Sequence, residues 1–204
     1  MNQTLDPPTE RTQENMDKPF VKFEELQQTF NTIKKDIGGW GWLVVADGSG
    51  VVRESGHGTT LHAGGWATAV TSITPTDVPG SPANVVWRYG GQTGMTTYRA
   101  EFTGLLEGLR VVLEDAYEGE QVLCLTDCDA IVQQLRSNNR RAQKKDRKHS
   151  DLWLLWEYYS SKLSIEIMHI KRTNTLLLHN NCDLYSAILR AAVEEIELDP
   201  FKLN

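Results

Sequence analysis

The order of strand-like and helix-like segments constrains the fold of this chain most. From residue 40 to residue 95, apolar and β-branched runs are separated by segments rich in glycine or proline, which is typical of an antiparallel meander. After residue 96, amphipathic helical runs alternate with the apolar runs "QVLCLTD" and "SIEIMHI". Strands that alternate with helices pair in parallel. The sequence therefore predicts an α/β fold with a mixed five-stranded sheet, antiparallel in its first three strands, parallel in its last two, and flanked by helices.

The individual elements are expected from local periodicity and turn residues. The first strand is expected in "WGWLVVADG", the next two members of the meander in "VVRESG" and "GGWATAVTSI", and a further candidate strand in "VVWRYGG". Helices are expected in "YRAEFTGLLEGLRVVLEDA", "DAIVQQLRS", "SDLWLLWEYYSSKL" and "NNCDLYSAILRAAVEEIEL". Ser150 is the expected N-cap of the third of these helices.

The first 37 residues are expected to form an N-terminal extension, and residues 38–198 the folded domain. Residues 1–19 contain almost no apolar side chains, so this tail is expected to be disordered. Between residues 21 and 37, apolar side chains recur at intervals of three and four, which predicts an amphipathic helix. This helix is expected to dock on the domain, with recruitment of a protein partner as the alternative.

The composition predicts an intracellular globular protein. Hydrophobic residues make up 40% and charged residues 24% of the 204 residues, and no apolar run approaches the roughly 18 residues of a membrane span. The N-terminus lacks the apolar core of a signal peptide. The three cysteines, Cys124, Cys128 and Cys182, are an odd number without metal spacing, so they are expected to be small apolar core residues rather than disulfides. We therefore expect a cytoplasmic or nuclear protein without membrane association.

Positive charge is concentrated in one short stretch, although the formal net charge is −6. Seven of the 21 lysines and arginines lie between residues 136 and 148: Arg136, Arg140, Arg141, Lys144, Lys145, Arg147 and Lys148. A local basic stretch can contact phosphates even in an acidic protein.

Four acidic residues lie at the ends of different predicted elements. Asp47 and Asp127 follow apolar strands, and Glu101 and Asp183 lie near the starts of amphipathic helices. Carboxylates beside apolar strands are costly to bury unless a cation compensates them. Oxygen ligands without histidine or cysteine suit Mg²⁺ or Mn²⁺. This pattern predicts a metal-dependent enzyme that acts on phosphate esters.

These segments, in this order, resemble the type 1 ribonuclease H family from about Trp40 to about Val193. "VADGSG" resembles the Asp-Gly-Ser of the family's first strand, and "TTYRAEFTGLLEGL" resembles its Arg-x-Glu helix start. "LTDCDAIVQQL" resembles its Thr-Asp-Ser segment, "KKDRKHSDLW" the approach to its Asp-Leu-Trp helix, and "NNCDLYSAI" its last helix, which begins with Cys-Asp. The resemblance implies the ribonuclease H-like fold.

The resemblance also implies an activity and a set of residue roles. Members of the family hydrolyse the RNA strand of RNA–DNA hybrids with two Mg²⁺ ions about 3.5–4 Å apart, for which Mn²⁺ can substitute, and leave 5′-phosphate and 3′-hydroxyl ends. By position, Asp47 would bridge both ions, Asp127 would bind the ion that activates water, and Asp183 the ion at the leaving oxygen. Glu101 would hold water and sense the ribose 2′-hydroxyl. Substrate contacts are implied for Gly48, Ser49, Thr97, Tyr98, Cys128, Arg140, Arg141, Lys144, Lys145 and Thr173.

Several positions depart from the family pattern. The family often has asparagines where Thr97 and Tyr98 stand, serine at Cys128, and glutamine at Asp129, which here adds negative charge near the phosphate site. Thr173 stands where a loop histidine often helps product release. His169 and His179 lie nearby but out of register, so neither receives that role.

Two other functions fit less well. A ribonuclease H-like module that only binds nucleic acid or takes part in assembly would normally have lost one or more of the acids, and all four are present. A DNA-acting nuclease or recombinase of the wider superfamily would share the first-strand and fourth-strand acids, but rarely the Arg-x-Glu and Asp-Leu-Trp features together.

Overall fold

The structure is a computed structural model that describes residues 41–54, 60–72, 85–136, 148–170 and 177–198. The strands are β1 (Gly41–Glu54), β2 (Thr60–Ser72), β3 (Val86–Thr93), β4 (Gln121–Thr126) and β5 (Ser164–His169). The helices are α3 (Thr97–Asp115), α4 (Asp129–Arg136), α5 (Ser150–Lys162) and α6 (Leu177–Leu198). The predicted N-terminal extension, including the helix at 21–37, lies outside these ranges.

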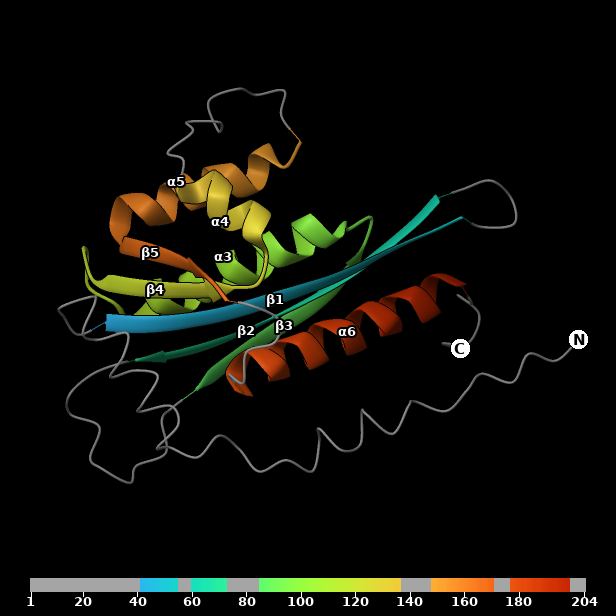
Figure 1. The fold of residues 1–204 in the computed structure, drawn as a ribbon, viewed down its shortest axis with the longest axis horizontal. Coiled ribbons are helices and arrows are strands. Elements are labelled where there is room, and N and C mark those ends of the chain that lie inside the picture. The colour runs from blue at the N-terminus through green and yellow to red at the C-terminus, as the bar shows by residue number, and fades with distance from the viewer. Residues whose placement is uncertain (1–40, 55–59, 73–84, 137–147, 171–176, 199–204) are drawn as a thin grey trace, which may run out of the picture.

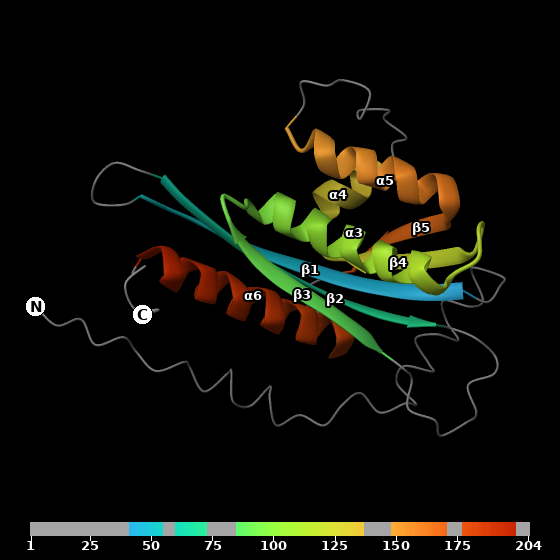
Figure 2. The ribbon, with the colours of Figure 1, turned by 180° about the vertical axis from the view of Figure 1, so that it is seen from behind.

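The strands form one mixed sheet in the order β3-β2-β1-β4-β5. β1 pairs antiparallel with β2, and β2 antiparallel with β3, whereas β4 pairs parallel with both β1 and β5. Among the described helices, α3, α4 and α5 lie on one side of this sheet and α6 lies on the other, as both views show (Figures 1 and 2). The predicted fold class is confirmed.

Each face of the sheet carries its own apolar core. On one face, Val44 of β1 and Cys124 of β4 pack with Phe102 of α3 and Trp153 of α5. On the other face, Leu43 and Val45 of β1 and Leu123 of β4 pack with Leu178 and Cys182 of α6. Alternate residues of the same strands serve opposite cores because strand side chains alternate between the two faces. The central strands are therefore almost continuously buried, which explains their long apolar runs.

The prediction of a separate strand in "VVRESG" is wrong. The segment Val51–Glu54 continues β1, and β1 stays in register with β2 through its glycines, with Gly50 opposite Gly64. The third antiparallel strand is β3 instead. A Cβ atom at Gly48 would lie 2.1 Å from the backbone nitrogen of Glu101, so this glycine admits helix α3 against the strand. The glycines of "DGSG" thus serve close packing rather than a turn.

Two helix starts also differ from the prediction. His149, in the left-handed conformation (φ 67°, ψ 27°), caps α5 in place of Ser150, which is the first helical residue. Helix α6 begins at Leu177, three residues before the predicted Asn180. This earlier start matters for the site because it places His179 on the helix. Among the described residues, no helix is both long enough and apolar enough to cross a membrane.

Candidate functional site

Two aspartates and one histidine meet at the centre of the sheet. Asp47 lies in β1, and Asp127 immediately follows β4, the parallel neighbour of β1. Since Val45 is the register partner of Leu125, the two aspartates lie at matching positions two residues further along. His179 of α6 completes the group: its Nε2 lies 3.6 Å from Asp47 Oδ1 and 4.0 Å from Asp127 Oδ1. One ligand atom from each of the three residues lies within 4.8 Å of the other two.

The three side chains of this group are almost fully withdrawn from solvent. Exposed fractions are 2% for the Asp47 side chain, 5% for Asp127 and 4% for His179. Burial of two carboxylates this close together concentrates negative charge in a region of low dielectric. The group therefore favours binding of a cation.

Hydrogen bonds fix how α6 lies on β1. The Cys182 thiol donates to the carbonyl oxygen of Val45 (3.3 Å), and the Ser186 hydroxyl donates to Asp47 Oδ2 (2.6 Å). His179, Cys182 and Ser186 are spaced by three and four residues, so they share one face of the helix. That face lies on β1, whereas Asp183 is exposed and is not a member of the group.

Glu101 lies next to this group but is not part of it. It is the fifth residue of α3 and only 4% exposed. The helix begins after Thr96, whose side-chain oxygen accepts a hydrogen bond from the backbone N–H of Arg99. The contact between Gly48 and the backbone of Glu101 then holds the first turn of α3 against β1, directly beside Asp47. Glu101 is thus buried next to Asp47.

The pKa values of two cysteine thiols are raised near the Asp47–Asp127–His179 group. Burial raises the pKa of Cys128 to about 11, with further contributions from the charges of Glu101 and Asp127. Burial also raises the pKa of Cys182 well above its ordinary value, and the charges of Asp47, Asp183 and Glu101 add to this effect. All four predicted carboxylates therefore act on thiols beside the centre. In the metal-free protein both thiols are therefore protonated at neutral pH.

An ion pair joins two motifs that are far apart in the sequence. Arg99, at the start of α3, forms a bidentate pair with Asp151 at the start of α5, with Nη1 3.1 Å from Oδ1 and Nη2 in contact with Oδ2. The pairing raises the pKa of Arg99 and lowers that of Asp151. The arginine of the Arg-x-Glu segment thus links two helices, while the glutamate of the same segment faces the sheet.

Comparison with known proteins supports the fold. A family model described as "Reverse transcriptase-like" matches residues 81–179. The chain is similar in fold to the N-terminal ribonuclease H domain of Rv2228c from Mycobacterium tuberculosis (TM-score 0.52, 16% identity, covering 75% of this chain and 96% of that one). The chain has a ribonuclease H-like fold. No curated protein matches it in sequence.

Two further solved structures have a similar ribonuclease H-like fold. One is a foamy viral protease-reverse transcriptase in complex with double-stranded DNA (TM-score 0.54, 17% identity, 76% of this chain and 96% of that one). The other is LC11-RNase H1 in complex with an RNA/DNA hybrid (TM-score 0.54, 13% identity, 75% of this chain and 99% of that one). At these identities the likeness is one of fold.

The predicted substrate contacts of this ribonuclease H-like chain are dispersed. Gly48 is buried under α3, Ser49 is half-buried, and the Thr97 hydroxyl donates to the carbonyl oxygen of Gly50 (3.3 Å). Cys128 is half-buried, and its backbone N–H donates to the Thr126 hydroxyl (3.1 Å). The remaining candidates lie outside the described residues: Arg140, Arg141, Lys144, Lys145 and Thr173.

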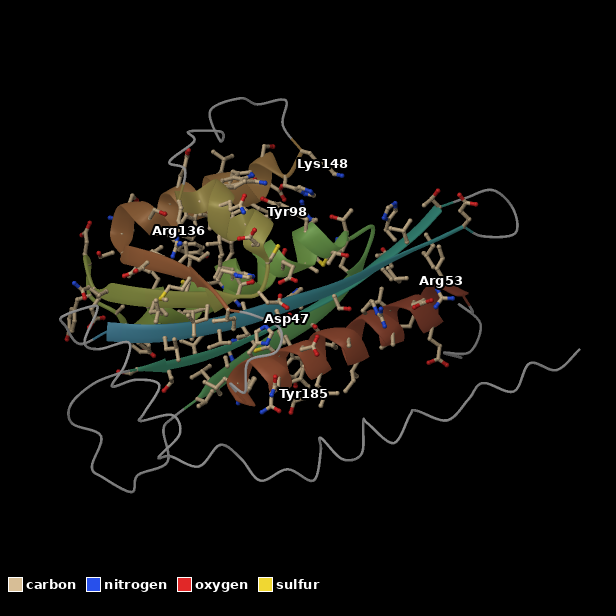
Figure 3. The ribbon with its side chains drawn as sticks, in the orientation of Figure 1. Asp47, Arg53, Tyr98, Arg136, Lys148 and Tyr185 are labelled. Atoms are coloured by element: carbon tan, nitrogen blue, oxygen red, sulfur yellow. The ribbon has the colours of Figure 1, made fainter. Side chains whose placement is uncertain are left out.

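Tyr98 lies away from the aspartates, toward α4 and α5 (Figure 3). Its hydroxyl donates to Gln134 Oε1 of α4 (3.0 Å), and its ring stacks on that of His149, with centroids 5.2 Å apart. These contacts explain how the helices on this face are held together.

Sequence reasoning missed His179 and Ser186. The signal was available in the spacing of His179, Cys182 and Ser186, which is that of one helix face. The predicted helix begins at Asn180 and so leaves out His179, which is considered only for a product-release role. The earlier start of α6 corrects this interpretation.

Proposed function

We propose that this chain is a metal-dependent endoribonuclease that hydrolyses the RNA strand of RNA–DNA hybrids and leaves 5′-phosphate and 3′-hydroxyl ends. The observation that carries the proposal is the meeting of Asp47 and Asp127 at the centre of a ribonuclease H-like sheet, with Glu101 buried beside them. These acids come from three separate elements, so their meeting is a product of the fold.

The residues present fit a divalent cation. Asp47 and Asp127 offer carboxylate oxygens within reach of one ion, in a buried region where negative charge needs compensation. Asp47, Asp127, Glu101 and Asp183 would hold the two ions, Mg²⁺ or Mn²⁺, with Asp183 approaching from the exposed side. Bound divalent ions would supply charge neutralisation at the phosphate and an activated water nucleophile.

The chain's own residues have separate roles in this proposal. The Ser186 hydroxyl keeps Asp47 oriented by donating to Oδ2, which leaves Oδ1 directed toward Asp127 and His179. Glu101 accepts a hydrogen bond from the ribose 2′-hydroxyl next to the scissile phosphate. Water forms the new bond to phosphorus, the bond to the 3′ oxygen breaks, and that oxygen leaves with a proton. The first turn of α3 excludes bulk water from the carboxylate side.

An RNA–DNA hybrid is the proposed substrate because a protein distinguishes RNA from DNA by the 2′-hydroxyl and by groove shape. LC11-RNase H1, which has a similar fold, was solved in complex with such a hybrid. The main chain around Gly48 and Ser49 and the side chains of Thr97 and Tyr98 are proposed to face the minor groove. Cys128 is proposed as a further substrate contact. The basic stretch with Arg140, Arg141, Lys144 and Lys145 is proposed to contact the other strand's phosphates.

The proposal is tested with a hybrid whose two strands carry different labels, incubated with Mg²⁺, with Mn²⁺ or with EDTA. Wild-type protein should cut only the RNA strand and only with metal. Asp127→Asn should reduce cleavage about a thousandfold or more, because a metal ligand contributes several kcal/mol to the transition state. Asp115→Asn is the control: it removes an exposed acid at the far end of α3 and should leave cleavage within about twofold.

The other outcomes also discriminate. Hybrid binding without cleavage in either metal would favour a non-catalytic ribonuclease H-like binding module. Cleavage of the DNA strand, or of duplex DNA alone, would indicate a changed substrate and point to Thr97, Tyr98 and Asp129 as its cause. Cleavage that persists in EDTA would contradict the metal requirement.

A further inference from the structure

We infer that His179 is a ligand of the ion held by Asp47 and Asp127, so this centre combines imidazole nitrogen with carboxylate oxygen. The inference rests on the proposed metal dependence and adds a residue to which the resemblance assigns no role. It follows from the position of the imidazole, from the contacts that fix α6, and from the chemistry of the three donors.

The distances suit shared coordination. His179 Nε2 lies 3.6 Å from Asp47 Oδ1 and 4.0 Å from Asp127 Oδ1. Ligands bound to one ion at about 2.0–2.2 Å are separated by distances of this size. The three donor atoms therefore surround a space that one cation can occupy without a change in the backbone.

The contacts of α6 keep the imidazole in this position. Cys182 is fully buried and bonds to the carbonyl oxygen of Val45, one turn after His179. Ser186 is also fully buried and bonds to Asp47 itself, one further turn along. Because both contacts fix the rotation and height of the helix, the His179 side chain is directed at the aspartates. Second-shell contacts of this kind orient metal ligands in proteins.

The two carboxylate oxygens of Asp47 contact different residues of α6. Oδ2 accepts the Ser186 hydroxyl, and Oδ1 faces His179 Nε2. An ion at the centre would therefore bind Oδ1, with Ser186 orienting the carboxylate from behind. For Nε2 to bind the same ion, the ring proton must reside on Nδ1.

A nitrogen ligand changes which ion the centre prefers. Mg²⁺ favours all-oxygen coordination, whereas imidazole suits divalent ions of the first transition series. The Asp47–Asp127–His179 group should therefore bind Mn²⁺ and Co²⁺ in preference to Mg²⁺, and loss of the imidazole should reduce that preference. Asp183 lies one turn after His179 and is exposed. In this inference it would bind metal on the side of the site that faces substrate.

The decisive experiment is pulsed electron paramagnetic resonance of the full chain with one equivalent of Mn²⁺ and no nucleic acid. Coupling of the ion to an imidazole nitrogen is expected in the wild-type protein. Labelling the histidines with ¹⁵N should change that coupling in the manner expected for a directly bound nitrogen. This measurement requires no substitution, so it does not depend on whether a variant folds.

Substitution then assigns the nitrogen. His179→Gln should abolish the coupling and weaken Mn²⁺ binding by about tenfold or more in calorimetry, since even outer-shell partners typically contribute 10–100-fold to affinity. Mg²⁺ binding should weaken less. His169→Gln is the matched control. This exposed histidine ends β5 and lies close to the site, with Nε2 3.1 Å from the carbonyl oxygen of Asp127. It should retain both the coupling and the affinity.

The results separate this inference from the proposed function. Hybrid cleavage without nitrogen coupling in the wild-type protein would overturn the role of His179 and leave the proposed activity intact. Nitrogen coupling without cleavage of hybrid would support His179 as a metal ligand and contradict the proposed activity. Coupling that persists in His179→Gln but is lost in His169→Gln would contradict the assignment to His179.

Discussion

The most constrained side chain in this protein is that of Asp47. Its carboxylate is 2% exposed, accepts a hydrogen bond from Ser186, and faces the imidazole of His179. A buried carboxylate in a sheet is costly, and the hydrogen bond from Ser186 offsets part of its desolvation. The residue therefore links the stability of the fold to the chemistry of the site.

Ser186→Ala should lower stability through Asp47. The substitution removes a short, charge-assisted hydrogen bond and leaves the buried carboxylate with one donor fewer. The free energy of unfolding in metal-free buffer should fall by about 1–3 kcal/mol, as measured by urea denaturation. Ser161→Ala provides the control, because that exposed hydroxyl donates to the carbonyl oxygen of Tyr158 in its own helix. Equal losses in the two variants would refute a specific role for the contact with Asp47.

At the scale of the elements, two contacts position α3. Gly48 lets the first turn of the helix approach β1 closely enough to bury Glu101, and the pair of Arg99 with Asp151 ties the same turn to α5. The first contact is steric and admits no side chain. The second is electrostatic and partly exposed, with 31% of the Arg99 side chain and 55% of that of Asp151 accessible. Its contribution to stability should therefore be small and dependent on pH.

The pH dependence of this pair has a defined sign. Arg99 lowers the pKa of Asp151 in the folded protein, so the stabilisation is fully present above the ordinary aspartate pKa of about 3.9 and is lost as the pH falls through the lower, folded pKa. Asp151→Asn should reduce the free energy of unfolding by less than about 1 kcal/mol at pH 7, since exposed pairs are screened by solvent.

The measurement is urea unfolding of wild type and Asp151→Asn from pH 7 to pH 2.5. The difference between the two proteins should be constant down to about pH 4 and shrink below it. Glu118→Gln serves as control, because the pair of Glu118 with Lys162 is more exposed and should contribute little at any pH. A difference that widens on acidification would contradict the assigned sign.

At the scale of the whole molecule, charge is distributed unevenly. The chain has a formal net charge of −6, yet a third of its lysines and arginines lie between residues 136 and 148. Such a distribution favours the binding of phosphate groups at the basic stretch and repels them from the acidic remainder of the surface. The described end of this stretch is anchored, because Arg136 Nε donates to the carbonyl oxygen of Ile167 (3.1 Å).

Removal of this basic stretch should alter how hybrid binding responds to salt. With Arg140, Arg141, Lys144 and Lys145 all changed to alanine, the slope of log K against log[salt] should fall in magnitude by as much as about 3.6, because each of the four phosphate contacts contributes up to about 0.9. The binding assays use the Asp127→Asn background, so that the hybrid is not cleaved during the measurement. The salt concentration is varied from about 50 to about 200 mM. Arg110→Ala, which breaks a pair with Glu107 within one helix, should leave the slope unchanged. An unaltered slope in the fourfold variant would place the phosphate contacts elsewhere.

The sequence by itself determined the order of elements, the class of sheet and the four candidate acids, because these depend on local periodicity and on residue type. The tertiary structure decided what local patterns do not contain. Close packing against α3 explains the glycines of β1, which read locally as a turn, so "VVRE" became part of a long strand. The register of α6 on β1 directed His179 to the aspartates and left Asp183 exposed, because hydrogen bonds from Cys182 and Ser186 to β1 set the rotation of the helix.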